Sequence, residues 1–226
     1  TRAIVVNSPA NPTGWTASRD ELAAILDLAR ARGLWIIADE IYARFVHDER
    51  IQVGPRAAAF KDVMSAEDRV LFVQTFSKNW AMTGWRIGWL EAPPVLGGVI
   101  ENLIQYSSSG TAAFLQRAGI AALDHGEDFV ALQIERAREG RRIVCDGLRA
   151  TGRVDLSPPP GAFYAFFKVH GANDSRALAK RLVDDANVGL APGFAFGPGG
   201  EGHLRLCFAR KAEDLDETVR RLAPVL

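Results

Sequence analysis

Residues 70–78 read Val70-Leu71-Phe72-Val73-Gln74-Thr75-Phe76-Ser77-Lys78. The apolar run predicts a short buried strand, and the polar residues after it predict the point where the chain leaves a sheet. A solvated lysine just past a strand is the ordinary interpretation of such a residue taken alone. The other residues near strand ends must therefore show whether Lys78 has a chemical role.

Three more apolar runs, at residues 3–6, 34–38 and 86–90, predict further strands. Between the first two, Ser18 and Glu21 have the spacing of a helix capping box, an apolar helix face follows, and Gly33 is a natural helix stop. Strands that alternate with amphipathic helices favour an α/β fold with a mostly parallel sheet.

The second half of the chain has a different pattern. A long helix is predicted at residues 127–149, with a length that suits a connector between two lobes. After it we expect strands at 162–167 and 203–208, helices at 175–185 and 213–222, and a Gly/Pro-rich loop at 192–202. The sequence thus predicts a large domain at residues 1–126 and a smaller α+β domain at 127–226.

Composition narrows the function classes. The chain has 226 residues, of which 27 are basic and 27 acidic, so nothing global favours nucleic acid or an anionic membrane. No apolar stretch is long enough to span a bilayer. Cys145 and Cys207 lack metal-ligand spacing; reduced thiols in a cytoplasmic protein are expected, with one disulfide left open. The chain begins inside an expected strand, which suggests a piece of something longer.

Notable residues follow each predicted strand, where ligands of open α/β sheets bind. Asn11 begins the run Asn-Pro-Thr-Gly, Asp39 and Tyr42 follow the second strand, and Arg86 opens the fourth. Each has an ordinary explanation: a turn, a helix cap or a surface ion pair. An amine such as Lys78 can also form a Schiff base with a carbonyl cofactor. Two hydroxyls and an arginine near Lys78 supply hydrogen-bond donors for a phosphate: Thr75, Ser77 and Arg86.

Taken together, five motifs resemble the class I/II aminotransferases, which are fold-type I pyridoxal-phosphate enzymes. The motifs run in that family's order over essentially the whole chain. They are Asn11-Pro12-Thr13-Gly14, Ala38-Asp39-Glu40-Ile41-Tyr42, Thr75-Phe76-Ser77-Lys78, Gly84-Trp85-Arg86-Ile87-Gly88 and Leu204-Arg205.

The resemblance implies a role for each residue in binding pyridoxal 5'-phosphate. Lys78 is the Schiff-base lysine and the general acid/base of the proton shift. Asp39 faces the pyridine nitrogen and keeps it protonated. Tyr42 and Asn11 hydrogen-bond the phenolic oxygen. The phosphate is bound by Thr75, Ser77 and Arg86.

The resemblance implies that Arg205 binds the substrate α-carboxylate and that Asn11 also takes part in substrate binding. An arginine within an apolar strand is costly unless it is paired, so a purely structural partner is the alternative. Tyr106-Ser107-Ser108-Ser109-Gly110 is expected to be a polar loop. Phe163 or Tyr164 could edge the site.

The implied protein is a homodimeric aminotransferase that moves an amino group between an amino acid and a 2-oxo acid. The N-terminal half of the family is absent, so this is expected to be the carboxyl-terminal part of a subunit that is inactive or poorly soluble alone. Two alternatives stay open: a carbon–sulfur β-lyase with the same cofactor, and a non-catalytic, aminotransferase-like domain of a regulator. The substrate side chain is not readable.

Overall fold

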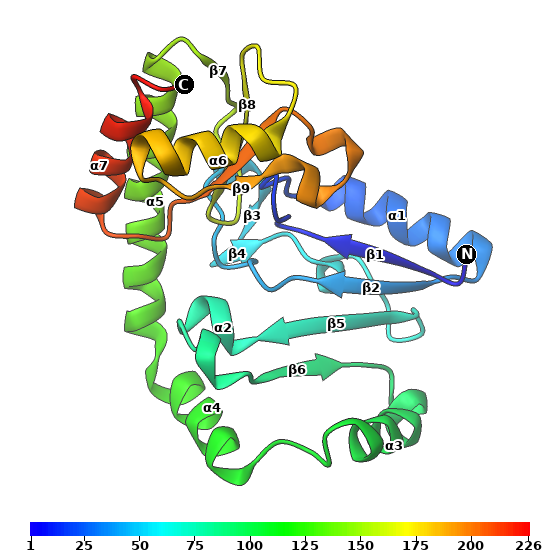
Figure 1. Cartoon of the computed structure of the whole chain (residues 1–226). Helices are drawn as coiled ribbons and strands as arrows, with labels where there is room; N and C mark the ends of the chain where they lie inside the picture. The colour runs from blue at the N-terminus through cyan, green and yellow to red at the C-terminus, as the bar shows by residue number, and fades with distance from the viewer. The chain divides into compact units, whose positions relative to one another are not determined.

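The apolar run at residues 70–73 forms β5 (Val70–Thr75) in a four-stranded sheet of order β1-β2-β5-β6 (Figure 1). β2 (Trp35–Asp39) pairs in parallel with β1 (Ala3–Asn7) on one side and with β5 on the other. β6 (Gly88–Glu91) is antiparallel to β5. The α/β class and the mostly parallel sheet are confirmed, with one antiparallel strand at the edge.

The register of the parallel strands aligns their carboxyl ends. Asn7 lies opposite Asp39, and Asp39 lies opposite Val73. Parallel neighbours leave the sheet at the same edge, so the segments after β1, β2 and β5 all begin there.

α1 (Arg19–Arg32) begins and ends where the sequence predicts. Ser18 and Glu21 form the reciprocal capping box, and Gly33 ends the helix at a φ of 61°. The apolar face of α1 packs in a core with the sheet, which includes Leu22, Leu26, Val6, Ile36, Val70 and Phe72.

Several expectations for this region were wrong in detail. Lys78 follows β5 as expected, but it lies on a four-residue helix, α2 (Phe76–Asn79), that was not predicted. Arg86 has a left-handed conformation, with a φ of 53°, and precedes β6 because this backbone cannot extend a strand. Tyr106 and Ser107 belong to α3 and not to a loop.

The first half also contains elements that were not predicted. They are too short, or too weakly marked by caps, to be read from the sequence. They are β3 (Gln52–Val53), β4 (Arg56–Ala57), α3 (Gly97–Ser107), α4 (Ala113–His125), and the 3-10 helices η1 (Glu49–Ile51), η2 (Phe60–Asp62), η3 (Thr83–Trp85) and η4 (Pro94–Leu96).

Apolar side chains remain exposed on α3 and α4. No residue of α3 is buried. Val5 on β1 is also 67% exposed, so one face of this edge strand meets solvent. The large exposed side chains of the two helices are Val99, Leu103, Ile104, Tyr106, Phe114, Ile120 and Leu123.

In the second half, β7 (Val154–Asp155), β8 (Tyr164–Val169), β10 (His203–Cys207) and β9 (Ala191–Pro192) form a sheet in that order, and all its pairs are antiparallel. The helices are α5 (Glu127–Ala150), α6 (Ser175–Ala186) and α7 (Ala212–Leu222). The loop expected at 192–202 contains two 3-10 helices, η5 (Gly193–Phe196) and η6 (Pro198–Gly200).

The computed structural model describes residues 1–226, which fall into two units by their contacts. Unit 1 comprises Thr1–Pro9 and Thr16–Leu132, and unit 2 comprises Ala10–Trp15 and Gln133–Leu226. The division lies within α5, close to residue 126. The assignment of residues 1–126 and 127–226 as large and small domains stays a prediction.

Residues 10–15 group with unit 2, although the sequence places them in the first domain. Gly161 N–H donates to the Gly14 carbonyl at 3.1 Å. Gly14 has a φ of 72°, and a Cβ there would lie 2.4 Å from the Pro159 Cβ. This contact requires glycine for both conformation and space.

Other expectations concern metals, thiols and membranes. No cluster of three or more His, Cys, Asp or Glu side chains is arranged to hold a metal ion. Cys145 is buried, Cys207 is half-buried, and both are free thiols, so the disulfide left open is not formed. None of the helices combines the length and apolar character needed to cross a membrane.

Glu40 is an acid buried within unit 1, with 7% of its surface exposed. Phe60 N–H donates to its Oε1 at 3.2 Å. Burial raises the pKa of Glu40 from 4.5 to about 7, against the opposing effects of this hydrogen bond and of Arg56 and Lys61. The folded protein therefore favours the protonated form of Glu40. The contribution of this form to the free energy of unfolding is fully present below pH 4.5 and is lost as the pH rises through 7.

Replacing Glu40 with glutamine should remove this pH dependence. Glutamine cannot ionise but still offers an oxygen to Phe60 N–H. Between pH 4.5 and 8 we expect the wild-type free energy of unfolding to fall by roughly 3 kcal/mol relative to Glu40→Gln. Urea unfolding across this range measures the difference, with exposed Glu101→Gln as the control. Parallel pH curves for wild type and Glu40→Gln would contradict the assignment.

Candidate functional site

Asp39 ends β2 and is held there through its own backbone. Its carbonyl accepts hydrogen bonds from the Asn7 side-chain amide and from Ser8 N–H, both at 3.1 Å. These bonds come from β1 and the residue after it, so the parallel pairing of β1 with β2 fixes the position of Asp39.

The Asp39 carboxylate is incompletely satisfied. Its Oδ1 atom is buried and has no hydrogen-bond partner. Burial raises the pKa of Asp39, while a hydrogen bond from Ile41 N–H and the charge of Lys78 act in the opposite direction. An unpaired buried acceptor costs stability, so this oxygen has an unmet requirement for a donor.

Lys78 is placed by the turn that follows β5. Thr75 caps α2, because its Oγ1 accepts from Ser77 N–H at 3.1 Å, and the same hydroxyl donates to the Ile87 carbonyl at 3.3 Å. The Lys78 Nζ lies 5.5 Å from the centre of the Tyr42 ring, which is buried. The ammonium group therefore has an aromatic face beside it and the Asp39 charge within reach.

Arg86 is held near the same turn. Its Nη1 donates to the Thr83 carbonyl at 3.1 Å, and the Thr83 hydroxyl donates to the Ser77 carbonyl at 3.2 Å. A left-handed conformation at a residue with a side chain is unfavourable by about 1–2 kcal/mol, and such strain concentrates at functional sites.

These side chains line one cavity of unit 1, with a volume of about 420 Å³. It therefore brings together five of the six residues of unit 1 predicted to bind the cofactor, and Tyr42 contacts Lys78. The lining residues are Asp39, Ile41, Val73, Gln74, Thr75, Ser77, Lys78, Thr83, Arg86, Ile87 and Gly88.

Asn11 and Arg205, the remaining predicted residues, lie together in unit 2. Arg205 on β10 donates from Nη1 to the Asn11 Oδ1 at 2.7 Å, although the residues are 194 positions apart. The guanidinium carbon lies 4.5 Å from the Tyr164 ring centre and 4.8 Å from that of Phe196. Its Nε is buried and has no hydrogen-bond partner.

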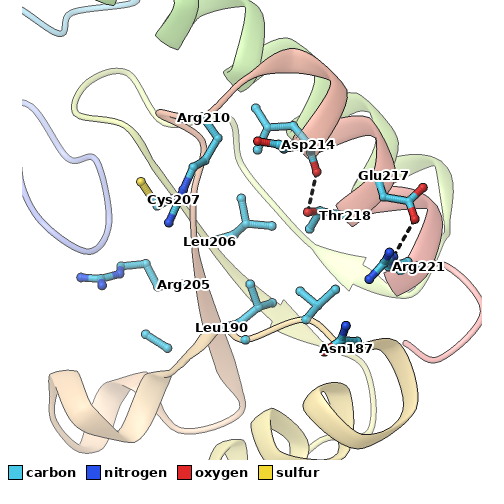
Figure 2. Close-up of a pocket in the computed structure, with 14 residues that line it drawn as sticks. Asn187, Leu190, Arg205, Leu206, Cys207, Arg210, Asp214, Glu217, Thr218 and Arg221 are labelled. Carbon is cyan, nitrogen blue, oxygen red and sulfur yellow. Dashed lines mark hydrogen bonds and ion pairs between the residues drawn. The ribbon is translucent and has the colours of Figure 1, made fainter.

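A pocket of about 470 Å³ lies beside the carboxyl-terminal residues of β10 (Figure 2). Figure 2 shows Arg205 and Cys207 extending from one side of β10, while Leu206 extends toward α7. Two ionic or polar pairs on α7 line it: Glu217 with Arg221, and Thr218 with the Asp214 carbonyl. Arg205 is the one predicted site residue that lines this pocket.

Some residues of the site were not singled out from the sequence. Gln74 and Thr83 line the cavity of unit 1, and Phe196 contacts Arg205. Thr83 follows the Lys78 motif closely, which is a usable signal. Phe196 has no such signal in the sequence, because only the folding of the Gly/Pro-rich loop places it against a strand. Tyr164, expected only at an edge, contacts Arg205 directly.

The donor set of the unit 1 cavity matches a phosphorylated pyridine aldehyde. Lys78 supplies an amine, Arg86 a cation for phosphate, and Ser77 a hydroxyl. The buried Asp39 Oδ1 offers the acceptor that a protonated ring nitrogen requires. The Thr75 hydroxyl already serves the α2 cap and Ile87, so its phosphate role stays a prediction.

Comparisons with known proteins show which family the chain resembles. The chain is 33% identical over 229 residues to the aspartate aminotransferase of Pyrococcus horikoshii, covering 100% of this chain and 57% of that protein. It is also 33% identical over 232 residues to aromatic-amino-acid aminotransferase 2 of Thermococcus litoralis, with the same coverage. The solved aspartate aminotransferase of Thermotoga maritima superposes with a TM-score of 0.89 at 32% identity, covering 100% of this chain and 56% of that one.

The chain thus spans a little over half the length of these relatives. The family model for aminotransferase class I and II matches residues 1–222. Enzymes of this family use pyridoxal phosphate. With nearly its whole length matched, this chain belongs to the class I and II aminotransferases.

Proposed function

We propose that the protein carrying this chain is a pyridoxal-phosphate-dependent aminotransferase that moves an amino group between an amino acid and a 2-oxo acid. The observation that supports it most is the unit 1 cavity, which is lined by Lys78, Arg86 and Asp39 and in which the Asp39 Oδ1 atom is buried without a hydrogen-bond partner. A homodimeric assembly and a cytoplasmic location are parts of the same proposal and follow from the resemblance alone.

Within this proposal the cavity residues hold the two ends of the cofactor. Arg86 and Ser77 bind its phosphate, and Asp39 accepts a hydrogen bond from its protonated ring nitrogen. That contact satisfies Oδ1 and favours the ionised carboxylate, in the direction opposite to burial. Tyr42, beside Lys78, and Asn11 hydrogen-bond the phenolic oxygen.

When bound, the cofactor supplies an electron sink for the carbanion formed at the substrate α-carbon. Lys78 would hold and move the proton: its Nζ would take the proton from the substrate α-carbon and release it at the other end of the three-atom system, as a 1,3-proton shift requires. Proton transfer by a positioned side chain contributes about 10²–10⁴-fold in rate. The Tyr42 ring and the Asp39 charge keep Nζ in place.

Arg205 binds the substrate α-carboxylate, with Asn11 fixing one of its terminal nitrogens. Charge-assisted hydrogen bonds from a planar guanidinium suit a carboxylate. One relative is named for aspartate and another for aromatic amino acids. These amino acids share the α-carboxylate and differ in the side chain. A substrate within either class is compatible with the residues described.

A substitution of Lys78 tests its role in the cavity. Lys78→Ala should abolish the visible absorbance band of bound pyridoxal phosphate and lower transamination by at least about a thousandfold, because the residue loses both its bond to the cofactor and its proton transfer. The test measures the absorbance of the full-length protein and its formation of glutamate from 2-oxoglutarate. Exposed Lys61→Ala should retain both.

The same assay separates the reaction classes. Retention of the band in Lys78→Ala would overturn the assignment of the lysine. Pyruvate and thiol formed from cystathionine, without glutamate from any amino donor, would favour the β-lyase reaction. A bound cofactor with no turnover of any donor would favour the regulator domain.

A second variant tests Asp39. Asp39→Asn keeps the size of the side chain and removes its charge, so the ring nitrogen loses its ionic partner. We expect the dissociation constant of pyridoxal phosphate to rise about tenfold, in line with loss of a hydrogen bond to a charged group. A fluorescence titration measures it, with exposed Asp20→Asn as the matched control. Equal affinity in Asp39→Asn and wild type would refute the contact.

A third variant tests Arg205. Arg205→Lys retains the charge but loses the planar fork, so KM for amino donor and 2-oxo acid should rise about tenfold or more. Arg210→Lys is the matched control, since Arg210 also lines the unit 2 pocket but is exposed. Steady-state kinetics with both substrates measure the change. If Arg210→Lys raised KM as much as Arg205→Lys, the carboxylate would have to be placed elsewhere.

A further inference from the structure

Arg205 lies on the aromatic face of β10. The register of β10 with β8 places Arg205 opposite Phe166 and Cys207 opposite Tyr164. The alternate residues, Leu204 and Leu206, are buried on the other face. Arg205 therefore shares a face of the sheet with Phe166 and has Tyr164 as its diagonal neighbour.

Two aromatic rings lie against the guanidinium of Arg205. Tyr164 lies 4.5 Å from its carbon on β8, and Phe196 lies 4.8 Å away on η5. Hydrogen bonds to a guanidinium form in its plane, whereas aromatic rings contact its faces. The rings thus restrict and desolvate Arg205 without competing for the donors that a carboxylate needs.

Phe196 is held in place by the rest of its loop. Gly193 and Gly200 pack so closely that a Cβ on Gly193 would lie 1.9 Å from the Gly200 carbonyl oxygen. Phe194 N–H donates to the hydroxyl of buried Ser175 at 3.1 Å. The Phe196 ring also meets Phe166 edge-on, with centres 6.0 Å apart.

We propose that Phe196, with Tyr164, is a positioning residue for Arg205, and that it sets the affinity of the site for the substrate carboxylate without entering the chemical steps. This rests on the proposed function of Arg205. An arginine carries considerable rotamer freedom, and fixing it before the carboxylate arrives lowers the entropy lost on binding.

Phe194 provides a matched control within the same 3-10 helix. Its ring lies against a different arginine, with the Arg176 guanidinium carbon 4.5 Å from its centre, whereas the rings that lie over the Arg205 guanidinium belong to Tyr164 and Phe196. Phe196→Leu should raise KM for 2-oxoglutarate about tenfold and leave kcat within about twofold, since only carboxylate binding is affected. Phe194→Leu should leave KM unchanged, and Phe196→Tyr should restore it to near the wild-type value.

A second readout does not depend on catalysis. In NMR spectra of the cofactor-free protein, the Arg205 Nε–H, identified by its absence from Arg205→Lys, should be shifted upfield by the two rings. Phe196→Leu should move it downfield, and Phe194→Leu should not. Titration with 2-oxoglutarate then gives its dissociation constant at Arg205 in each variant.

The outcomes separate the two proposals. If 2-oxoglutarate leaves the Arg205 signal unmoved in the wild type, the carboxylate role of Arg205 fails. If it binds wild type and Phe196→Leu with equal affinity, the positioning role of Phe196 fails while the role of Arg205 stands. A fall in kcat equal to the rise in KM would also overturn the positioning role, as would equal effects of Phe194→Leu and Phe196→Leu.

Discussion

The parallel pairing of β1, β2 and β5 is the constraint on which the unit 1 site depends. It aligns the strand ends, so Asn7 and Ser8 can both bond the Asp39 carbonyl. The same alignment starts α2 directly after β5, which brings Lys78 to the Tyr42 ring. A slip of one residue in this register would turn the side chains of the slipped strand to the other face of the sheet.

The site retains features that reduce stability. The Asp39 Oδ1 is buried without a donor, and Arg86 has a left-handed backbone. Natural proteins depart from local rules mainly where function requires it. Both features are explained if a ligand with a protonated nitrogen and a phosphate occupies the cavity. Arg205 follows a related principle, because aromatic faces restrict it while Asn11 engages one of its terminal nitrogens.

Much of this arrangement was predictable because its signals are local. The capping box of Ser18 and Glu21, the stop at Gly33 and the apolar runs of the sheet depend on neighbouring residues only. α3 and α4 were missed because neither has a side-chain cap, and their exposed apolar residues obscure a core-facing pattern. The helix that carries Lys78 was not predicted because four residues are too few to leave a periodic signal.

The sequence by itself determined the α/β class, the helices α1, α5, α6 and α7, and the residue types of the site in the order typical of a class I and II aminotransferase. Side-chain chemistry and short-range periodicity carry that information. Only the tertiary structure decided that residues 10–15 pack with unit 2, that Asn11 bonds Arg205, and that Phe196 covers the guanidinium. These contacts join segments far apart in the chain, and their geometry exists only after the strands have paired and the loops have closed.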